Sequence, residues 1–276
     1  MHLLELTNIL EKAFIEDIGM GDITSEPIFS SEATGNGVFT AKADGVVSGL
    51  QTIETGYRIL DPNIQVTLFK SDGDNVIKGD KIAEVSGATR ALLTGERVIL
   101  NLIQHLSGIA TSTQDVITLL DDPSIKVTDT RKTLPGLRVL QKYAVRCGGG
   151  KNHRFRLDDG VIIKDNHIKA AGSLTQAVEL ARNHCGHMVN IEVETESRNQ
   201  VAEAVSAKAD VIMLDNRSAK EVKELRKNIP EGILVEVSGG ITPKNVGSYK
   251  NCGADIISLG WLTHSVKALD ISFNLN

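Results

Sequence analysis

Hydrophobic and polar positions follow two different patterns along the chain, and the change falls near residue 108. Before it, apolar residues at helical spacing predict an amphipathic helix over residues 3–14. Short runs between Gly and Asp residues predict strands at 37–43, 65–70 and 81–86. A helix over 95–110 joins the two halves, and its uncharged polar residues Asn101, Gln104 and His105 suggest a contact surface. The first half is therefore expected to be a mixed α/β domain.

After about residue 120, strand-length apolar runs alternate with helical stretches. The predicted strands are 126–130, 161–164, 189–194, 211–214, 234–237 and 256–259. The helices between them include 174–183, 197–207 and 219–228. Strands that alternate with helices of this length indicate a parallel sheet. Six strands are visible and a seventh could be hidden, so we expect an incomplete or open relative of the eight-stranded α/β barrel.

Polar or ionisable residues follow each of these strands. They are the segments 129–132, 164–167, Glu194, 215–216, 238–240 and Gly260. In a barrel of parallel strands these ends converge on one face, where active sites lie. Because the strand interiors are otherwise apolar, we expect a functional site at this face.

Composition narrows the class of protein. A chain of 276 residues with 41% hydrophobic residues suits one large domain and one smaller domain. A net charge of −5 argues against a nucleic-acid partner. No apolar run approaches the roughly 20 residues that a membrane helix needs, and no signal peptide is visible, so we expect a cytoplasmic protein without a membrane partner. Cys147, Cys185 and Cys252 are too widely spaced for a disulfide framework or a metal knuckle.

One segment reverses the acidic balance. Residues 131–169 contain ten Lys or Arg residues against three Asp residues. Arg138, Lys142 and Arg146 share one face of a predicted helix that ends at Gly148, and we expect this face to be partly solvated. The cations at strand ends are different, because converging like charges are unfavourable unless they bind an anion such as carboxylate or phosphate.

Two further features point to a phosphorylated substrate. Ser238, Gly239 and Gly240, followed by Gly260, resemble the phosphate cradle after the last two strands of many barrels. Glu194 and Asp215 end neighbouring strands, and oxygen ligands of this kind suit Mg²⁺. An acid/base pair or structural salt bridges are the alternatives for these two carboxylates. The residues thus favour phosphoryl or phosphoribosyl chemistry on a multiply anionic substrate.

Several motifs then occur in a recognisable order. They are DTRKTLPGLR at 129–138, GGGKNHR at 148–154, IKDNH at 163–167, IEVE at 191–194, MLDN at 213–216 and VSGGI at 237–241. This series resembles the signature of the quinolinate phosphoribosyltransferases, and the resemblance runs essentially end to end.

The resemblance implies a fold, an activity and an assembly. Residues 1–108 would form an N-terminal α/β sandwich domain packed on an open seven-stranded α/β (TIM-like) barrel of residues 109–264, and the tail 265–276 would return to the first domain. The implied enzyme is a pentosyltransferase that uses Mg²⁺. It transfers phosphoribose from 5-phosphoribosyl 1-pyrophosphate (PRPP) to quinolinate with decarboxylation, giving nicotinate mononucleotide, pyrophosphate and CO₂ for NAD biosynthesis. A homodimer or higher homo-oligomer is also implied.

The resemblance assigns roles to individual residues as well. The quinolinate carboxylates would be held by Arg131, His153, Arg154 and Lys164, with Arg97 reaching in from the neighbouring subunit and Thr130 nearby. Lys132 and Lys164 would contact PRPP, and Glu194 and Asp215 would bind its ribose and Mg²⁺. These four residues, Lys132, Lys164, Glu194 and Asp215, are the implied catalytic set. The 5′-phosphate would be received by Ser238, Gly239, Gly240, Gly260 and His264.

Other interpretations stay open at this point. A paralogue of the same fold could keep the donor site and change the acceptor, although the intact set Arg131, His153 and Arg154 disfavours it. A barrel lyase or synthase could use a phosphosugar without pyrophosphate. A non-catalytic carrier module would explain the turn pattern at 73–80 but would leave the charged strand ends without a purpose.

Overall fold

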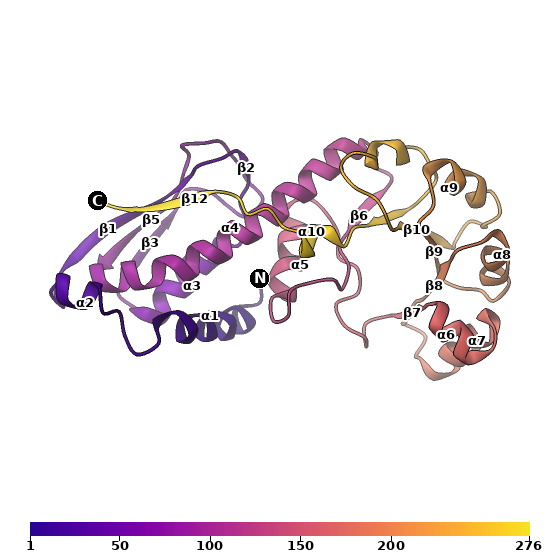
Figure 1. Cartoon of the computed structure of the whole chain (residues 1–276), viewed down its shortest axis with the longest axis horizontal. Coiled ribbons are helices and arrows are strands. Elements are labelled where there is room, and N and C mark those ends of the chain that lie inside the picture. The colour runs from indigo at the N-terminus through magenta and orange to yellow at the C-terminus, as the bar shows by residue number, and fades with distance from the viewer. The chain divides into compact units, whose positions relative to one another are not determined.

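The computed structural model describes residues 1–276 and divides the chain into two compact units (Figure 1). The first unit comprises Met1–Gln114, Thr133–Gly149 and Leu262–Asn276, and the second comprises Asp115–Lys132 and Gly150–Trp261. The segment Thr133–Gly149, which the sequence placed within the barrel range, lies in the first unit.

The first unit is built on an antiparallel sheet with the strand order β12-β1-β5-β3. Its strands are β1 (Thr34–Ala41), β3 (Gln65–Leu68), β5 (Lys81–Ala88) and β12 (Ile271–Leu275), and a short ribbon pairs β2 (Gly45–Val46) with β4 (Asn75–Val76). Its helices include α1 (Leu3–Ile18), α2 (Ser25–Ile28) and α3 (Gln51–Leu60). The C-terminal strand β12 pairs with β1 from Gly37 opposite Leu275 to Ala41 opposite Ile271.

Aromatic packing ties the elements of this unit together. The ring of Phe39 on β1 lies 4.9 Å from that of Phe273 on β12 and 6.4 Å from that of Tyr57 on α3, centroid to centroid. All three side chains belong to one buried apolar cluster, which also takes in α1 through Leu6, Leu10 and Phe14. The mixed α/β unit expected from the sequence is therefore confirmed.

Two helices differ from expectation. Helix α4 (Thr89–Leu120) is twice as long as the predicted 95–110, and the contact surface expected of Gln104 and His105 lies within their own unit, against Ile271 and Gln141. Helix α5 (Arg138–Cys147) carries Lys142 fully buried, so the expected solvated face is wrong at that position. The helical period predicted for α5 is correct, but the face of α5 that packs inward includes Lys142. Although α4 has 32 residues, no helix combines the length and the apolar character needed to cross a bilayer.

The second unit contains the predicted parallel sheet. Its strands are β6 (Lys126–Thr128), β7 (Val161–Ile163), β8 (Ile191–Thr195), β9 (Val211–Asp215), β10 (Leu234–Ser238) and β11 (Ile256–Ser258), in the order β6-β11-β10-β9-β8-β7. The sheet has six strands, and a single parallel bridge between Thr128 and Lys151 occupies the place where a seventh would extend the β6 edge. The fold class expected from the sequence, an α/β protein with a barrel-like unit, is confirmed.

Helices follow the strands and lie outside the sheet in Figure 1. They are α6 (Asp165–Ala171), α7 (Leu174–His184), α8 (Arg198–Ser206), α9 (Ala219–Arg226) and a 3₁₀ turn at Val246–Tyr249. Helix α10 (Trp261–His264) follows β11, and all but its first residue belong to the first unit. Serine caps start three of them: Ser173, Ser197 and Ser218 each accept a hydrogen bond from a backbone N–H of the first turn. Ser197 and Ser218 thus start the helices that follow β8 and β9, and Ser173 starts α7 after α6.

Candidate active site

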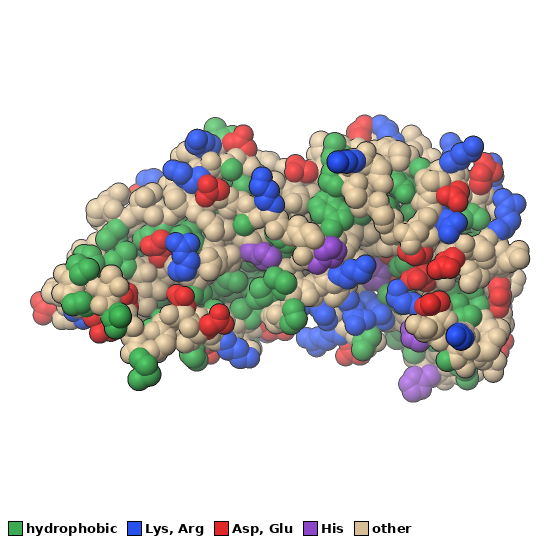
Figure 2. Space-filling model, viewed as in Figure 1, with side chains coloured by type: hydrophobic (Ala, Val, Ile, Leu, Met, Phe, Trp, Pro, Cys, Tyr) green, Lys and Arg blue, Asp and Glu red, His purple; other side chains and the backbone are tan.

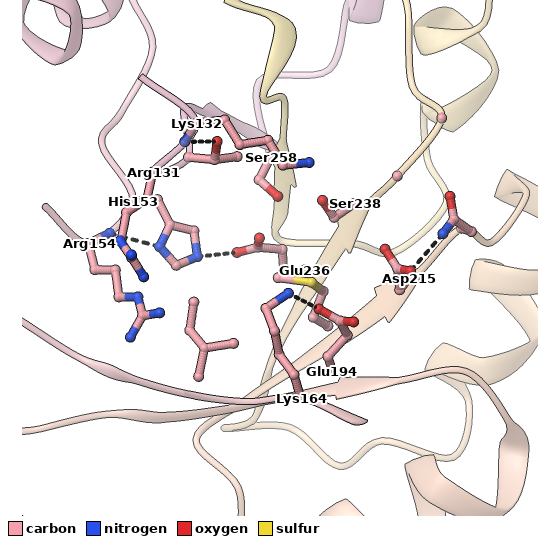
Figure 3. A pocket seen from close by; sticks show the side chains of 16 residues that line it. Arg131, Lys132, His153, Arg154, Lys164, Glu194, Asp215, Glu236, Ser238 and Ser258 are labelled. Atoms are coloured by element: carbon pink, nitrogen blue, oxygen red, sulfur yellow. Dashed lines mark hydrogen bonds and ion pairs between the residues drawn. The ribbon is translucent and has the colours of Figure 1, made fainter. Parts of the chain in front are cut away.

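A pocket of about 650 Å³ lies at the carboxyl ends of the parallel strands (Figure 3). Its lining includes most of the residues that the sequence singled out: Thr130, Arg131, Lys132, His153, Arg154, Lys164, Glu194, Asp215, Ser238, Gly239 and Gly240. In the second unit, Lys and Arg side chains gather beside a group of Asp and Glu side chains (Figure 2). The pocket therefore presents both signs of charge to one ligand volume.

Strand alternation explains why these side chains share the pocket. Successive residues of a strand point to opposite faces, so Glu194 and Glu192 lie on one face of β8 and Val193 lies on the other. In the parallel register Glu194 is opposite Met213, and Asp215 is opposite Ser238. Because the inward-pointing residues of neighbouring strands lie side by side in this register, their polar side chains form a continuous inner layer.

The cations come from the turn after β6 and from the loop before β7. Asp129, fully buried, accepts hydrogen bonds from the backbone N–H of His153 at 3.0 Å and from Nδ2 of Asn152 at 2.5 Å. This carboxylate holds the His153–Arg154 loop against the end of β6. Arg154 in turn donates from Nη1 to the carbonyl of Gly160 at 2.6 Å.

Arg154 lies in an unfavourable electrostatic environment without an anion. Burial lowers the pKa of its guanidinium, and the positive charge of Arg131 lowers it further. Its Nε is buried and has no hydrogen-bond partner within the protein. An anionic group bound between these two side chains would offset both effects.

Lys164 and Glu194 form an ion pair across the ends of β7 and β8 (Figure 3). The Lys164 side chain is 48% exposed, whereas that of Glu194 is only 15% exposed. Lys164 is also the residue that caps α6, where its backbone N–H donates to Nδ1 of His167 at 3.0 Å. The backbone of Lys164 is thus fixed by its hydrogen bond to His167, and its ammonium is held at the pocket by the carboxylate of Glu194.

Asp215 sits in a tight arrangement with the turn after β10. Its Oδ2 accepts a hydrogen bond from Nδ2 of Asn216 at 2.6 Å, and the backbone N–H of Asn216 donates to the carbonyl of Ser238 at 2.8 Å. Gly239 has φ +86°, and a Cβ there would lie 2.3 Å from Oδ1 of Asn216. Only glycine fits, so this turn leaves its backbone close to the pocket, as an anion cradle requires.

A buried cluster below these groups was missed by the sequence analysis. Nε2 of His153 lies 3.1 Å from Glu192 and 3.4 Å from Glu236, whose side chains are 7% and 2% exposed. The signal available in the sequence was a glutamate in the middle of each of two otherwise apolar strands, IEVET and LVEVS. Strand interiors had been interpreted as uniformly apolar, and this interpretation is wrong for β8 and β10.

The proton of His153 lies on the side of these carboxylates. Burial lowers its pKa, but hydrogen bonds to Glu192 and Glu236 raise it overall to about 10. Nδ1, however, accepts a hydrogen bond from the backbone N–H of Arg154 at 2.7 Å, so a second ring proton would require that bond to break. One ring proton therefore lies on Nε2, and the raised pKa favours a second on Nδ1, which would displace the Arg154 N–H. Burial also raises the pKa of Glu192.

Three of the predicted site residues do not line this pocket. Gly260 follows β11 in the second unit but lies outside the lining. Arg97 and His264 belong to the first unit; the Arg97 side chain is 59% exposed and lies 3.7 Å from Glu96, and Nδ1 of His264 lies 2.7 Å from the hydroxyl of Ser265.

Two family models match the chain in succession. Residues 22–107 match the N-terminal domain of quinolinate phosphoribosyl transferase, and residues 109–274 match the C-terminal domain. Together they cover most of the chain.

Curated relatives and solved structures agree with these models. The chain is 52% identical to a probable nicotinate-nucleotide pyrophosphorylase (carboxylating) of Bacillus subtilis, over 100% of this chain and 95% of the relative. It is 36% identical to a mitochondrial quinolinate phosphoribosyltransferase (decarboxylating) of Nicotiana glauca, over 99% and 82%. The solved structure of NadC from Streptococcus pyogenes superimposes with a TM-score of 0.97 at 39% identity, over 100% and 98%. The chain belongs to the quinolinate phosphoribosyl transferase family.

Proposed function

We infer that the protein transfers phosphoribose from PRPP to quinolinate and releases pyrophosphate and CO₂, leaving nicotinate mononucleotide for NAD biosynthesis. The family and the names of its full-length relatives support this activity. The observation that carries it is the pairing, in one pocket, of Arg131 and Arg154 with the carboxylates Glu194 and Asp215. A doubly negative ring and a pyrophosphorylated sugar need those two kinds of surface side by side.

We assign the acceptor to the side of the pocket that carries Arg131 and Arg154. Planar guanidinium groups suit carboxylates, because two parallel N–H groups can bind both oxygens. Lys164 faces the same space from β7 and could bind a second carboxylate. His153 lies beside them, but both of its ring nitrogens already have partners in the protein, so we give it a supporting place rather than direct carboxylate binding.

The donor occupies the opposite side in this proposal. The turn Ser238-Gly239-Gly240 offers a glycine backbone for the 5′-phosphate. Lys132 and Lys164 would contact pyrophosphate oxygens and stabilise the leaving group as the bond to C1 of ribose breaks. The pyridine nitrogen, held by its carboxylates, would then be placed to attack that carbon.

Glu194 and Asp215 are the residues that would hold Mg²⁺. They offer carboxylate oxygens only, from neighbouring strands, and the lining beside them provides Ser238 and no thiol. This is the donor chemistry that Mg²⁺ prefers, with waters and substrate oxygens as the remaining ligands. Bound there, the ion would supply positive charge to the ribose and pyrophosphate oxygens. Glu194, which would hold the ion, is also the carboxylate that pairs with Lys164 in the protein alone.

We further propose a cytoplasmic homodimer or larger homo-oligomer in which Arg97 reaches the pocket of the neighbouring subunit. Its side chain is exposed on α4 and its one ion-pair neighbour, Glu96, is adjacent in sequence. Mixing experiments test this arrangement. Arg97→Ala and Arg131→Ala proteins, each inactive alone, should recover partial activity when their subunits are exchanged, because one site of the mixed dimer is intact. No recovery after demonstrated exchange would contradict it.

The activity itself is tested by measuring both products. With PRPP, Mg²⁺ and quinolinate, pyrophosphate and CO₂ should appear in equal amounts. Nicotinate, which lacks the second carboxylate, is the matched control and should release little of either product from the same mixture. Pyrophosphate release that is equally fast with nicotinate would point to a different acceptor.

A further inference from the structure

A second pocket, of about 460 Å³, lies at the opposite end of the same strands. It is lined by the first residues of four of them, Val161, Val211, Leu234 and Ile256. It also shares His153, Arg154, Ile162 and Glu236 with the first pocket. Four side chains therefore border both pockets, and the junction of the pockets lies at these side chains and the His153 cluster.

The junction contains polar atoms without partners in the protein. They are the hydroxyls of Thr128 and Ser258, Oε1 of Glu192, Oε1 of Glu236 and Nε of Arg154, all of them buried. These residues line one pocket or the other: Thr128 and Glu192 the second, Ser258 the first, and Glu236 and Arg154 both. Buried polar groups in proteins are almost always satisfied by protein or by ordered water. The protein offers these atoms no partner, so ordered water or a bound anion would supply their hydrogen bonds.

We propose that ordered water enters through the second pocket and links it to the first, and that this route delivers the proton which replaces the carboxylate lost from the ring. Glu192 and Glu236 act as positioning residues. They fix the imidazole of His153 through Nε2 and leave one oxygen each for water. The inference rests on the proposed function, because it explains how that reaction ends.

The chemistry needs one proton from solvent. When the bond between ring carbon C2 and its carboxylate breaks, CO₂ leaves and the electron pair stays on C2. C2 takes a proton from water bound at Glu236 and Ser258, and that water regains a proton along the passage. One solvent proton is consumed for each CO₂ released. If protonation is slow, C2 can recombine with CO₂ before the gas escapes.

Single-turnover experiments can separate this step from sugar transfer. Leu234→Trp narrows the second pocket at a residue that the first pocket does not contain, and Thr128→Val removes one water partner at nearly constant volume. Leu180→Trp, on the exposed side of α7 and outside both pockets, is the control. Pyrophosphate, CO₂ and the dicarboxylate mononucleotide are measured together.

We expect CO₂ formation to slow roughly tenfold in Leu234→Trp and Thr128→Val while pyrophosphate release changes less than about twofold, as for loss of a proton-transfer route. The dicarboxylate mononucleotide should accumulate in these variants and not in Leu180→Trp. Glu236→Gln should behave in the same direction. The proposal would be overturned if CO₂ and pyrophosphate formed at equal rates, fast or slow, in Leu234→Trp, Thr128→Val and Glu236→Gln. A wild-type protein that releases neither product would instead overturn the proposed function, and this inference with it.

Discussion

Nζ of Lys164 is paired with Oε2 of Glu194 at the mouth of the pocket, so two groups assigned to different ligands neutralise each other before substrate binds. Glu194→Gln should free the ammonium while removing one metal ligand. We expect quinolinate alone, without Mg²⁺, to bind roughly threefold tighter, a small gain because Lys164 is half exposed and screened. Turnover should nevertheless fall. Calorimetry and steady-state rates measure the two effects, and weaker quinolinate binding would contradict the pairing argument.

Arg131→Ala and Arg154→Ala test the acceptor side. Each removes a charge-assisted hydrogen bond of about 1.5–3 kcal/mol, which corresponds to a loss of roughly tenfold to a hundredfold in kcat/KM for quinolinate. The KM for PRPP should change much less. Lys244→Ala, an exposed cation outside the pocket, is the matched control. Equal losses for both substrates would indicate a general disturbance of the site instead.

Gly239→Ala tests the turn after β10. The position has φ +86°, and a Cβ would lie 2.9 Å from Oδ1 of Asp215 as well as against Asn216. We expect a loss of about 1–2 kcal/mol from the left-handed backbone alone, together with a higher KM for PRPP because Asp215 is displaced. Thermal unfolding and donor titrations measure these effects. Gly186→Ala, where a Cβ meets nothing within 4 Å, should be neutral in both.

Asp22 gives a pH-dependent prediction in the first unit. Hydrogen bonds from the side chain and backbone of Ser25 lower the pKa of Asp22 to about 2 from 3.8. Because the folded pKa is depressed, the stabilisation is present above about pH 4 and is lost as the pH falls toward 2. Asp22→Ala should therefore lower the free energy of unfolding by about 1 kcal/mol at neutral pH.

The difference between Asp22→Ala and wild type should shrink as the pH approaches 2. Denaturant titrations across this range measure it. Asp17→Ala, an exposed acid on α1, is the control and should show no such convergence. A constant difference at every pH would mean that the loss arises from packing and not from the charge of Asp22.

The barrel unit was predictable because its strands are short, apolar and followed by polar ends. Periodicity therefore located β6 to β11, and chain order alone predicted that Lys164, Glu194 and Asp215 would meet. That step needed only the rule that parallel strands end on one face. The turn at Gly239 was predictable in the same way, because a glycine after a strand lets a bound anion approach the backbone closely.

Other features depended on packing that no local pattern encodes. Lys142 has the same spacing as Arg138 and Arg146, yet it is fully buried while Arg146 is exposed. Glu192 on β8 and Glu236 on β10 lie on the two strands that flank β9, and only the register of the sheet brings both to His153. Long-range pairing of this kind is set by the whole core and not by neighbours in sequence.

The alternation along β8 limits how this chain can change over evolutionary time. Loops before and after the strand can gain or lose residues, because they only connect elements. A deletion inside β8 would shift its register by one residue and turn Val193 toward the ligand while sending Glu192 and Glu194 among the helices. Relatives that keep the reaction should therefore vary in loop length on either side of a strand whose length stays constant.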